Sequence, residues 1–139
     1  MKHSLYGVLN WFIRLALENK KITVFGNGKQ LREYNYVDDA VDAMVLAAQS
    51  DKANGKFYLL GALKHIKFID MVKKVIKCCN GGSFELVPFP DERKSIEVGD
   101  FTVSFKKIKK ELGWTPTTSF EEGLEKTVDF YRKNRKDYF

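Results

Sequence analysis

The sequence predicts a mixed α/β fold built from helices and short strands. Apolar side chains recur at helical spacing in several segments, and β-branched and aromatic residues gather in short runs bounded by glycine. No segment repeats elsewhere in the chain. With 139 residues, 44% of them hydrophobic, the chain is long enough to bury a core. We therefore expect residues 1–139 to form a single unit.

Periodic apolar residues predict five helices. In the first, the polar residues Asn10, Arg14 and Glu18 recur every four positions, which is typical of an amphipathic helix. The last helix is expected to begin after Ser119, because Ser119 and Glu122 form a capping-box pattern. The charged residues 133–139 are expected to be a frayed tail. The expected helices cover about Leu5–Asn19, Asp39–Gln49, Phe68–Cys79, Phe105–Glu111 and Phe120–Lys133.

Three aspartates mark the expected start of the second helix. Asp38 or Asp39 stands at the position of an N-cap residue. Together with Asp42 they could bind a divalent cation, but the helix dipole also favours carboxylates at a helix start. We therefore interpret these aspartates as capping residues.

Strands are expected where β-branched and aromatic residues run together. The run Ile22–Phe25 leads directly into the tight turn Gly26-Asn27-Gly28. The unbroken apolar run from Phe57 to Leu60 is typical of a strand that is covered on both faces. The expected strands and extended segments are Ile22–Phe25, Leu31–Tyr36, Lys56–Leu60 and Phe84–Val87, the last followed by a loop with short extended pieces up to Val103.

The net charge of +6 raises the question of nucleic-acid binding. The lysines crowd beside the apolar residues of two predicted helices, as on a solvated helix face. A phosphate-binding patch needs charges that converge on one surface, and the sequence has no recognition helix, zinc-finger spacing or RNP-like strand. A basic RNA-binding domain therefore ranks last among the functions considered.

Apolar runs and cysteines indicate the compartment. No apolar run approaches the roughly 20 residues that cross a membrane, and the first segment lacks the uninterrupted apolar region of a signal peptide. The adjacent residues Cys78 and Cys79 are poorly placed for a disulfide with each other, and with two histidines a metal site lacks ligands. We expect reduced, metal-free thiols, a more buried Cys79, and a cytoplasmic protein.

Two sequence segments resemble a known family. From Gly26 to Asp39 the chain reads G-x-G-x-Q-x-R-E-Y-x-Y-V-x-D, and it later reads E-L-G-W-x-P from Glu111 and S-x-x-E-G-L from Ser119. These patterns, in this order, resemble the extended short-chain dehydrogenase/reductase family, the NAD-dependent epimerases and dehydratases of nucleotide sugars. One departure is Asn35, where the family usually carries an aliphatic residue.

Two features of that family's N-terminal half are absent from this sequence. The family has a G-x-x-G-x-x-G turn for the cofactor, whereas Leu31 stands here where a third glycine would be needed. The family also has a Tyr-x-x-x-Lys pair for proton transfer, and no tyrosine here has a lysine four positions later. The resemblance therefore implies the C-terminal substrate-binding portion of an extended Rossmann-type enzyme, with the N-terminal dinucleotide-binding half absent. NAD belongs to the intact family, and we expect this chain to bind no cofactor or metal by itself.

The resemblance also implies residues that bind the nucleotide diphosphate. Arg32 follows the glycine turn and can offer a fork of N–H donors to a phosphate. Arg93, or Lys94 if the register slips by one, stands where the family usually places a second arginine. From the residues alone, Arg32 could instead form an exposed salt bridge to a neighbouring carboxylate, and Arg93 could be a solvated loop charge.

A second set of residues completes the expected site. Val8, Thr23 and Phe25 are expected to line the nucleobase. No catalytic residue is assigned to this chain. We therefore expect it to bind and position a UDP-, dTDP-, CDP- or GDP-linked sugar for an epimerase (an isomerase) or a dehydratase (a lyase), and to be inactive alone. An alternative is a non-catalytic interaction or regulatory module derived from the same family.

The resemblance also predicts an incomplete surface. In the resembled fold, the helix that starts near Asp38 and the strand Lys56–Leu60 belong with a large sheet supplied mainly by the N-terminal half. Without that half, we expect an apolar patch that is either exposed or covered by a second copy. The expected partners are therefore the missing half or another copy of the chain, and no membrane. The patch residues are Val41, Val45, Phe57 and Leu59.

Overall fold

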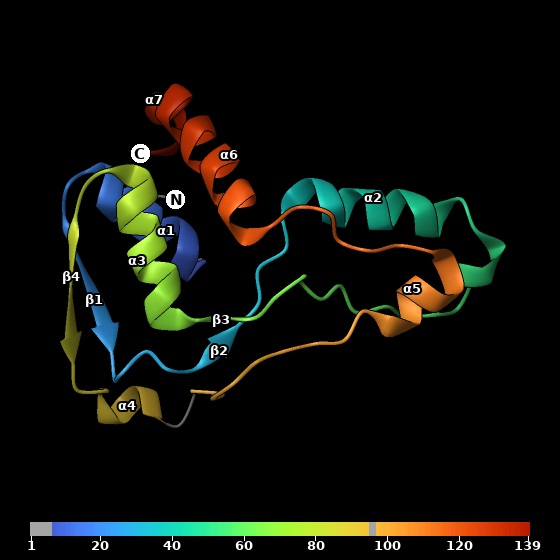
Figure 1. Cartoon of the computed structure of the whole chain (residues 1–139), viewed down its shortest axis with the longest axis horizontal. Coiled ribbons are helices and arrows are strands. Elements are labelled where there is room, and N and C mark those ends of the chain that lie inside the picture. The colour runs from blue at the N-terminus through green and yellow to red at the C-terminus, as the bar shows by residue number, and fades with distance from the viewer. Residues whose placement is uncertain (1–6, 95–96) are drawn as a thin grey trace. The chain divides into compact units, whose positions relative to one another are not determined.

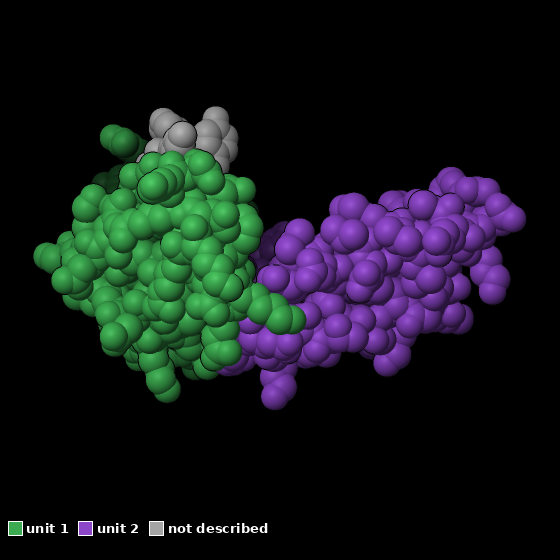
Figure 2. Space-filling model, turned by 90° about the horizontal axis from the view of Figure 1, so that it is seen from above, with its two compact units in different colours: residues 1–30, 67–99, 124–139 green, residues 31–66, 100–123 purple. Residues whose placement is uncertain are grey.

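The structure is a computed structural model that describes residues 7–94 and 97–139, without the side chains of Arg93 and Lys94. The chain folds into two compact units, each assembled from segments that are far apart in the sequence (Figure 1). Figure 2 colours the first unit, residues 1–30, 67–99 and 124–139, green, and the second unit, residues 31–66 and 100–123, purple. The prediction of one domain over residues 1–139 concerns how these units combine and stays a prediction.

The first unit is built around a parallel pair of strands. β1 and β4 pair in register from Lys21 opposite Ser83 to Phe25 opposite Val87. Helices α1 and α3 pack against each other, and α1 also contacts β1. The elements that lie wholly in this unit are α1 (Val8–Leu17), β1 (Lys21–Phe25), α3 (Phe68–Cys79), β4 (Ser83–Val87), α4 (Asp91–Lys94) and α7 (Arg135–Tyr138).

Apolar side chains from several elements form the core of this unit. Ile22 and Val24 are fully buried while their neighbours on β1 are exposed or half-buried, as expected for one covered face of a strand. The other buried apolar residues of the unit are Phe12, Ile13, Ala16, Met71, Val72, Val75, Cys79, Leu124 and Val128. Helix α6 (Phe120–Lys133) ends in this unit, where Arg132 donates to the last carbonyls of α3, on Cys78 and Cys79.

The second unit contains the remaining elements, and its core forms around Trp114. Ala43, Ile108 and Trp114 form a buried apolar cluster, and partly buried side chains pack against it. One of these is Phe105, whose ring meets the Trp114 indole edge-on. Its elements are β2 (Leu31–Arg32), α2 (Val37–Ala48), the 3-10 turn η1 (Asp51–Ala53) and α5 (Lys106–Leu112), and the short strand β3 (Ile66–Lys67), which pairs with β2, begins in it.

Asp39 is the buried charged residue in the described part of the chain, with 4% of its surface exposed. Its Oδ1 accepts hydrogen bonds from the Thr117 hydroxyl at 2.8 Å and the Thr117 amide at 3.2 Å, and its Oδ2 accepts from the Thr118 amide at 3.0 Å. Its main-chain carbonyl accepts from the Trp114 indole at 2.9 Å. Burial by itself would raise the pKa of Asp39, but these donors outweigh it and hold the pKa below the ordinary value.

Several sequence predictions are confirmed. Helices α3 and α6 have the predicted bounds, and the Ser119 hydroxyl accepts from the Glu122 amide at 3.2 Å, as a capping residue should. Cys79 is more buried than Cys78. The predicted start of the first helix at Leu5 lies outside the described residues.

Four local predictions are wrong. Lys56–Leu60 is not a strand, because no strand in the described ranges runs beside it; instead, Lys107 and Asn35 donate to its carbonyls. Neither Asp38 nor Asp39 caps α2, because the helix begins earlier and Asp39 is bonded to residues 117 and 118. Residues 135–138 are helical rather than frayed, because the aromatic rings at 130, 131, 138 and 139 pack together. The loop after Val87 contains the short helix α4.

We predict that Asp39→Ala lowers the free energy of unfolding by about 2–3 kcal/mol, because three donors lose a charged acceptor. Asp38→Ala is the matched control: Asp38 is exposed in the same helical turn, so its loss costs less than about 1 kcal/mol. Since the folded pKa of Asp39 lies below the ordinary 3.8, its contribution is present above that pH and is lost as the pH falls through the folded value. Urea unfolding of both variants at decreasing acidic pH measures this. The prediction is contradicted if the difference in free energy of unfolding between the wild type and Asp39→Ala does not shrink as the pH falls.

We predict that Cys79 does not react with iodoacetamide in the folded protein. Burial raises the pKa of its thiol to about 12, and its Sγ donates to the Ile13 carbonyl. Burial also raises the pKa of the half-buried Cys78, so we expect slow alkylation there and none at Cys79 until denaturant is added. Tandem mass spectrometry assigns the two adjacent sites, and equal rates at both in the folded state would contradict the prediction.

Candidate functional site

Arg32 lies on a backbone segment that is fixed on its N-terminal side. The Leu31 amide donates to Asp100 Oδ1 at 2.7 Å, and the Phe101 amide donates to the Leu31 carbonyl at 3.1 Å. The Arg32 guanidinium is half-buried and donates through Nη1 to that carbonyl at 2.9 Å. The side chain thus starts from an ordered strand, as the sequence predicts.

Glu33 fixes the same segment on its C-terminal side. Its side chain is 6% exposed, and its Oε2 accepts from the Val103 amide at 3.0 Å. Its Oε1 lies 2.7 Å from His65 Nδ1 as an ion-pair contact, and it has no hydrogen-bond partner among the described residues. Glu33 therefore links residues 31–36 to two other segments of the second unit, and sequence reasoning missed this link.

The next three residues bind the segment to the second unit. Tyr34 packs its ring against Phe120 with centroids 5.3 Å apart, and burial raises the pKa of its hydroxyl to about 12, so it stays protonated at neutral pH. The side-chain amide of Asn35 donates to the Leu60 carbonyl. Asparagine at this position, where the family usually carries an aliphatic residue, thus joins the segment to residue 60. Tyr36 lies against Gly123, where a Cβ would come 3.1 Å from its ring. The two sequence segments that resemble the family therefore contact each other.

The second predicted cation belongs to the first unit. Arg93 and Lys94 form the end of α4, and their side chains lie outside what the structure describes. Whether these residues and Arg32 face one ligand stays a prediction.

The predicted nucleobase-lining residues also belong to the first unit. Thr23 and Phe25 point to the same face of β1, opposite the buried Ile22 and Val24. The ring of Phe25 lies 5.8 Å from that of Phe89, and Val8 is 42% exposed at the start of α1. The structure thus brings Thr23 and Phe25 together on one strand face.

The glycine turn after β1 does not fit a dinucleotide. Gly26 and Gly28 both have positive φ, and a Cβ on Gly28 would come 2.9 Å from the Ile69 side chain. The turn is held by the Ile69 amide, which donates to the Gly28 carbonyl at 2.9 Å, and the next element is the strand β2 rather than a helix. Gly28 thus allows close packing against α3, and the segment after the turn does not open the helix N-terminus that holds a cofactor pyrophosphate in a dinucleotide-binding turn.

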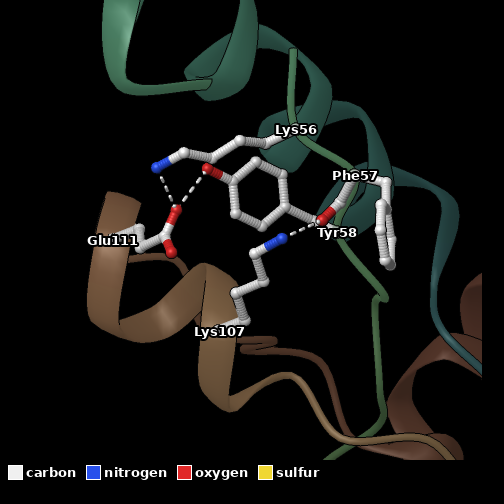
Figure 3. A network of polar contacts seen from close by, with 5 residues as sticks. All are labelled: Lys56, Phe57, Tyr58, Lys107 and Glu111. Atoms are coloured by element: carbon white, nitrogen blue, oxygen red, sulfur yellow. Dashed lines mark hydrogen bonds and ion pairs between the residues drawn. The ribbon is translucent and has the colours of Figure 1, made fainter. Parts of the chain in front are cut away.

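A polar network in the second unit holds the segment at residues 56–58 against α5 (Figure 3). Glu111 Oε2 accepts from Lys56 Nζ and from the Tyr58 hydroxyl, each at 2.8 Å. Lys107 Nζ donates to the Phe57 carbonyl at 2.9 Å and lies over the rings of Phe57 and Tyr58. Sequence reasoning missed this network, although Glu111 opens the E-L-G-W motif.

The expected apolar patch is exposed in this structure. Val41 and Val45 are each 48% exposed, Phe57 is 77% exposed and Leu59 is 52% exposed. Tyr58 and Leu60 pack against the core while their neighbours point outward, so the segment alternates like a strand with one uncovered face. We call the exposed residues Val37, Val41, Met44, Val45, Phe57 and Leu59 the apolar face.

Two further kinds of feature are absent from the described part of the chain. No group of three or more histidine, cysteine, aspartate or glutamate side chains there could hold a metal ion. None of the described helices has the length and hydropathy to cross a membrane.

Comparison with known proteins places the chain in a family. The family of GDP-mannose 4,6 dehydratase matches residues 7–127. The chain is 33% identical over 135 residues to UDP-N-acetyl-alpha-D-glucosaminuronate decarboxylase of Bacillus cytotoxicus, which covers 94% of this chain and 41% of that protein. It is 34% identical over 128 residues to dTDP-glucose 4,6-dehydratase of Shigella flexneri, covering 86% of this chain and 34% of that protein.

A solved structure supports the same relation. The UDP-glucose 4-epimerase of Thermotoga maritima, solved with UDP-glucose, superposes with a TM-score of 0.78 at 27% identity and covers 93% of this chain and 40% of that one. The chain thus spans between 34% and 41% of the length of these three relatives. The predicted family and α/β fold class are confirmed, and this chain belongs to the GDP-mannose 4,6-dehydratase family of NAD-dependent nucleotide-sugar dehydratases and epimerases.

Proposed function

We propose that this chain binds the nucleotide diphosphate of a nucleotide sugar and positions it for an NAD-dependent dehydratase or epimerase. The observation that carries the proposal is the ordered segment 31–36, which holds Arg32 between backbone and side-chain hydrogen bonds on both sides. A guanidinium on such a segment can meet two phosphate oxygens at once. Arg93 or Lys94 would supply the second cation.

The proposed role is one of binding rather than chemical catalysis. Tyr34 is protonated at neutral pH, and no catalytic residue is assigned to this chain. Holding the diphosphate fixes the attached sugar relative to groups that come from elsewhere, and such positioning lowers the entropic part of the barrier. NAD and the proton-transfer groups would be supplied outside this chain, because its sequence contains neither the family's cofactor-binding glycine turn nor its Tyr-x-x-x-Lys pair.

Three residues of the first unit, none of them fully buried, are proposed to line the nucleobase. Phe25 offers a ring against which a base can stack, and Thr23 offers a hydroxyl on the same face of β1. Val8 would add apolar contact from the start of α1. The base and the sugar remain open among UDP-, dTDP-, CDP- and GDP-linked compounds.

The apolar face is proposed to dock the dinucleotide-binding part of the enzyme. The chain spans about 40% of its relatives, so more than half of such an enzyme lies outside it. The segment at residues 57–60 has one uncovered face and no strand beside it in the described ranges, which suits the edge of a larger sheet. A second copy of the chain is the competing occupant.

A non-catalytic interaction module is the alternative function. The exposed apolar face favours it, because a patch of this kind marks a binding surface whether or not a nucleotide binds. The two functions differ in the ligand, since only the first requires nucleotide binding through Arg32.

We predict that titration with UDP, dTDP, CDP and GDP in a calorimeter shows binding to one of the four. Arg32→Ala should weaken that binding by about tenfold or more, and Arg32→Lys should restore only part of it, since a lysine meets the phosphates as a point charge. Lys29→Ala is the matched control, because it removes one exposed positive charge three positions away and should change affinity little. Absence of binding to all four would leave the interaction module as the better function, and NAD is expected not to bind.

We predict that the chain alone self-associates as its concentration rises, because the apolar face is left uncovered. Val41→Glu with Val45→Glu should shift sedimentation toward the monomer, since charges would then have to be buried in the contact. Val98→Glu is the control, as Val98 is 68% exposed in the first unit and outside the apolar face. A wild-type chain that sediments as a monomer at every concentration would contradict the prediction.

A further inference from the structure

We propose that Glu33 is a positioning residue for Arg32 and that His65 completes its carboxylate site. This inference deepens the proposed function and rests on it. Glu33 is adjacent to Arg32 in the sequence, but its side chain is almost fully buried, whereas that of Arg32 is half-buried. A carboxylate buried beside a ligand-binding arginine needs a reason, because burial of an unpaired charge is costly.

The hydrogen bonds of Glu33 supply that reason. Oε2 accepts from the Val103 amide at 3.0 Å, which joins the segment of Arg32 to residues 100–103. Two further hydrogen bonds join the same pair of segments at Leu31, through Asp100 and Phe101. The backbone of Arg32 is therefore held from both neighbours, at Leu31 by backbone groups and at Glu33 by its side chain.

The second carboxylate oxygen determines what His65 must do. Oε1 is buried and has no hydrogen-bond partner among the described residues, and His65 Nδ1 lies 2.7 Å from it. A carboxylate oxygen only accepts, so this contact is a hydrogen bond only when Nδ1 carries a proton. Glu33 therefore selects the histidine form with a proton on Nδ1, and the half-exposed imidazole closes the site from the solvent side.

The fold of the second unit does not depend on Glu33 alone. Tyr34, Asn35 and Tyr36 anchor the same segment through Phe120, Leu60 and Gly123, independently of Glu33. Loss of Glu33 should therefore leave the unit folded while it frees the backbone at residues 32 and 33. Diphosphate binding would then have to order this backbone, which lowers the affinity for the diphosphate. The loss arises only when Arg32 is present to bind the phosphate.

The first experiment reads the His65 tautomer by long-range ¹H–¹⁵N NMR at about pH 8. The chain has two histidines, so His3→Gln leaves a single imidazole to observe. We expect the proton on Nδ1 in this background, and a shift toward the Nε2–H form when Glu33→Gln is added. An Nε2–H imidazole with Glu33 intact would overturn the link between the two residues.

The second experiment is a double-mutant cycle read by affinity for the nucleoside diphosphate that binds. Glu33→Leu should weaken binding about tenfold in the wild-type background and change it little in Arg32→Ala, since its effect passes through Arg32. Glu33→Gln should restore most of the affinity, because an amide oxygen can accept from Val103. Glu111→Gln is the control: it perturbs the Lys56 and Tyr58 network of the same unit and should leave affinity unchanged.

The outcomes separate this inference from the proposed function. If Arg32→Ala weakens binding and Glu33→Leu costs the same in both backgrounds, Glu33 does not act through Arg32 and only this inference is wrong. If Arg32→Ala leaves affinity unchanged, the proposed function is wrong at Arg32, and the positioning role falls with it.

Discussion

The second unit depends on the hydrogen bonds that the buried Asp39 carboxylate accepts from Thr117 and Thr118. A charge with 4% exposure is tolerated only when donors satisfy it, so the segment at residues 114–118 must lie beside the start of α2. That arrangement brings the Trp114 indole to the Asp39 carbonyl and into the core with Ala43 and Ile108. It also sets the start of α6 against the segment that carries Arg32, through Tyr34 with Phe120 and Tyr36 with Gly123. The candidate site is therefore a consequence of long-range pairing rather than of the local strand alone.

The sequence correctly predicts those elements whose signal lies within a few neighbouring residues. Helix α3 follows from apolar spacing, and α6 follows from apolar spacing together with the Ser119 capping box. The strand at Lys56–Leu60 was predicted wrongly because an apolar run indicates burial but not pairing, and no strand in the described ranges pairs with this segment. Asp39 was predicted to cap a helix because local preference cannot reveal hydrogen-bond donors that lie about 80 positions later in the sequence, at Thr117 and Thr118. In the site, a motif indicated Arg32, whereas the partners of Glu33 lie 32 and 70 positions away and no local signal could connect them.

The second unit combines an ordered segment around Arg32 with an exposed apolar surface. Residues 31–36 are held by side chains and backbone from three other parts of the second unit, which is what a preorganised phosphate site requires. In the same unit, the apolar face exposes Phe57 and Leu59 on a segment whose other side is packed. The Glu111 network fixes this segment against α5 even though no strand in the described ranges pairs with it. The proposed function rests on these two features of the unit, the ordered segment around Arg32 and the exposed apolar face.

The measurement that tests the central claim most directly is a ¹H–¹⁵N correlation spectrum recorded during titration with UDP and, in turn, dTDP, CDP and GDP. If the chain binds a nucleotide diphosphate as proposed, one of the four should shift the backbone amides of Arg32 and Glu33 together with those of Arg93 and Lys94, along one saturation curve. The Lys29 and Arg132 amides should move little. Saturable shifts that spare residues 31–33 would contradict the account, and so would no shift with any of the four at millimolar concentration.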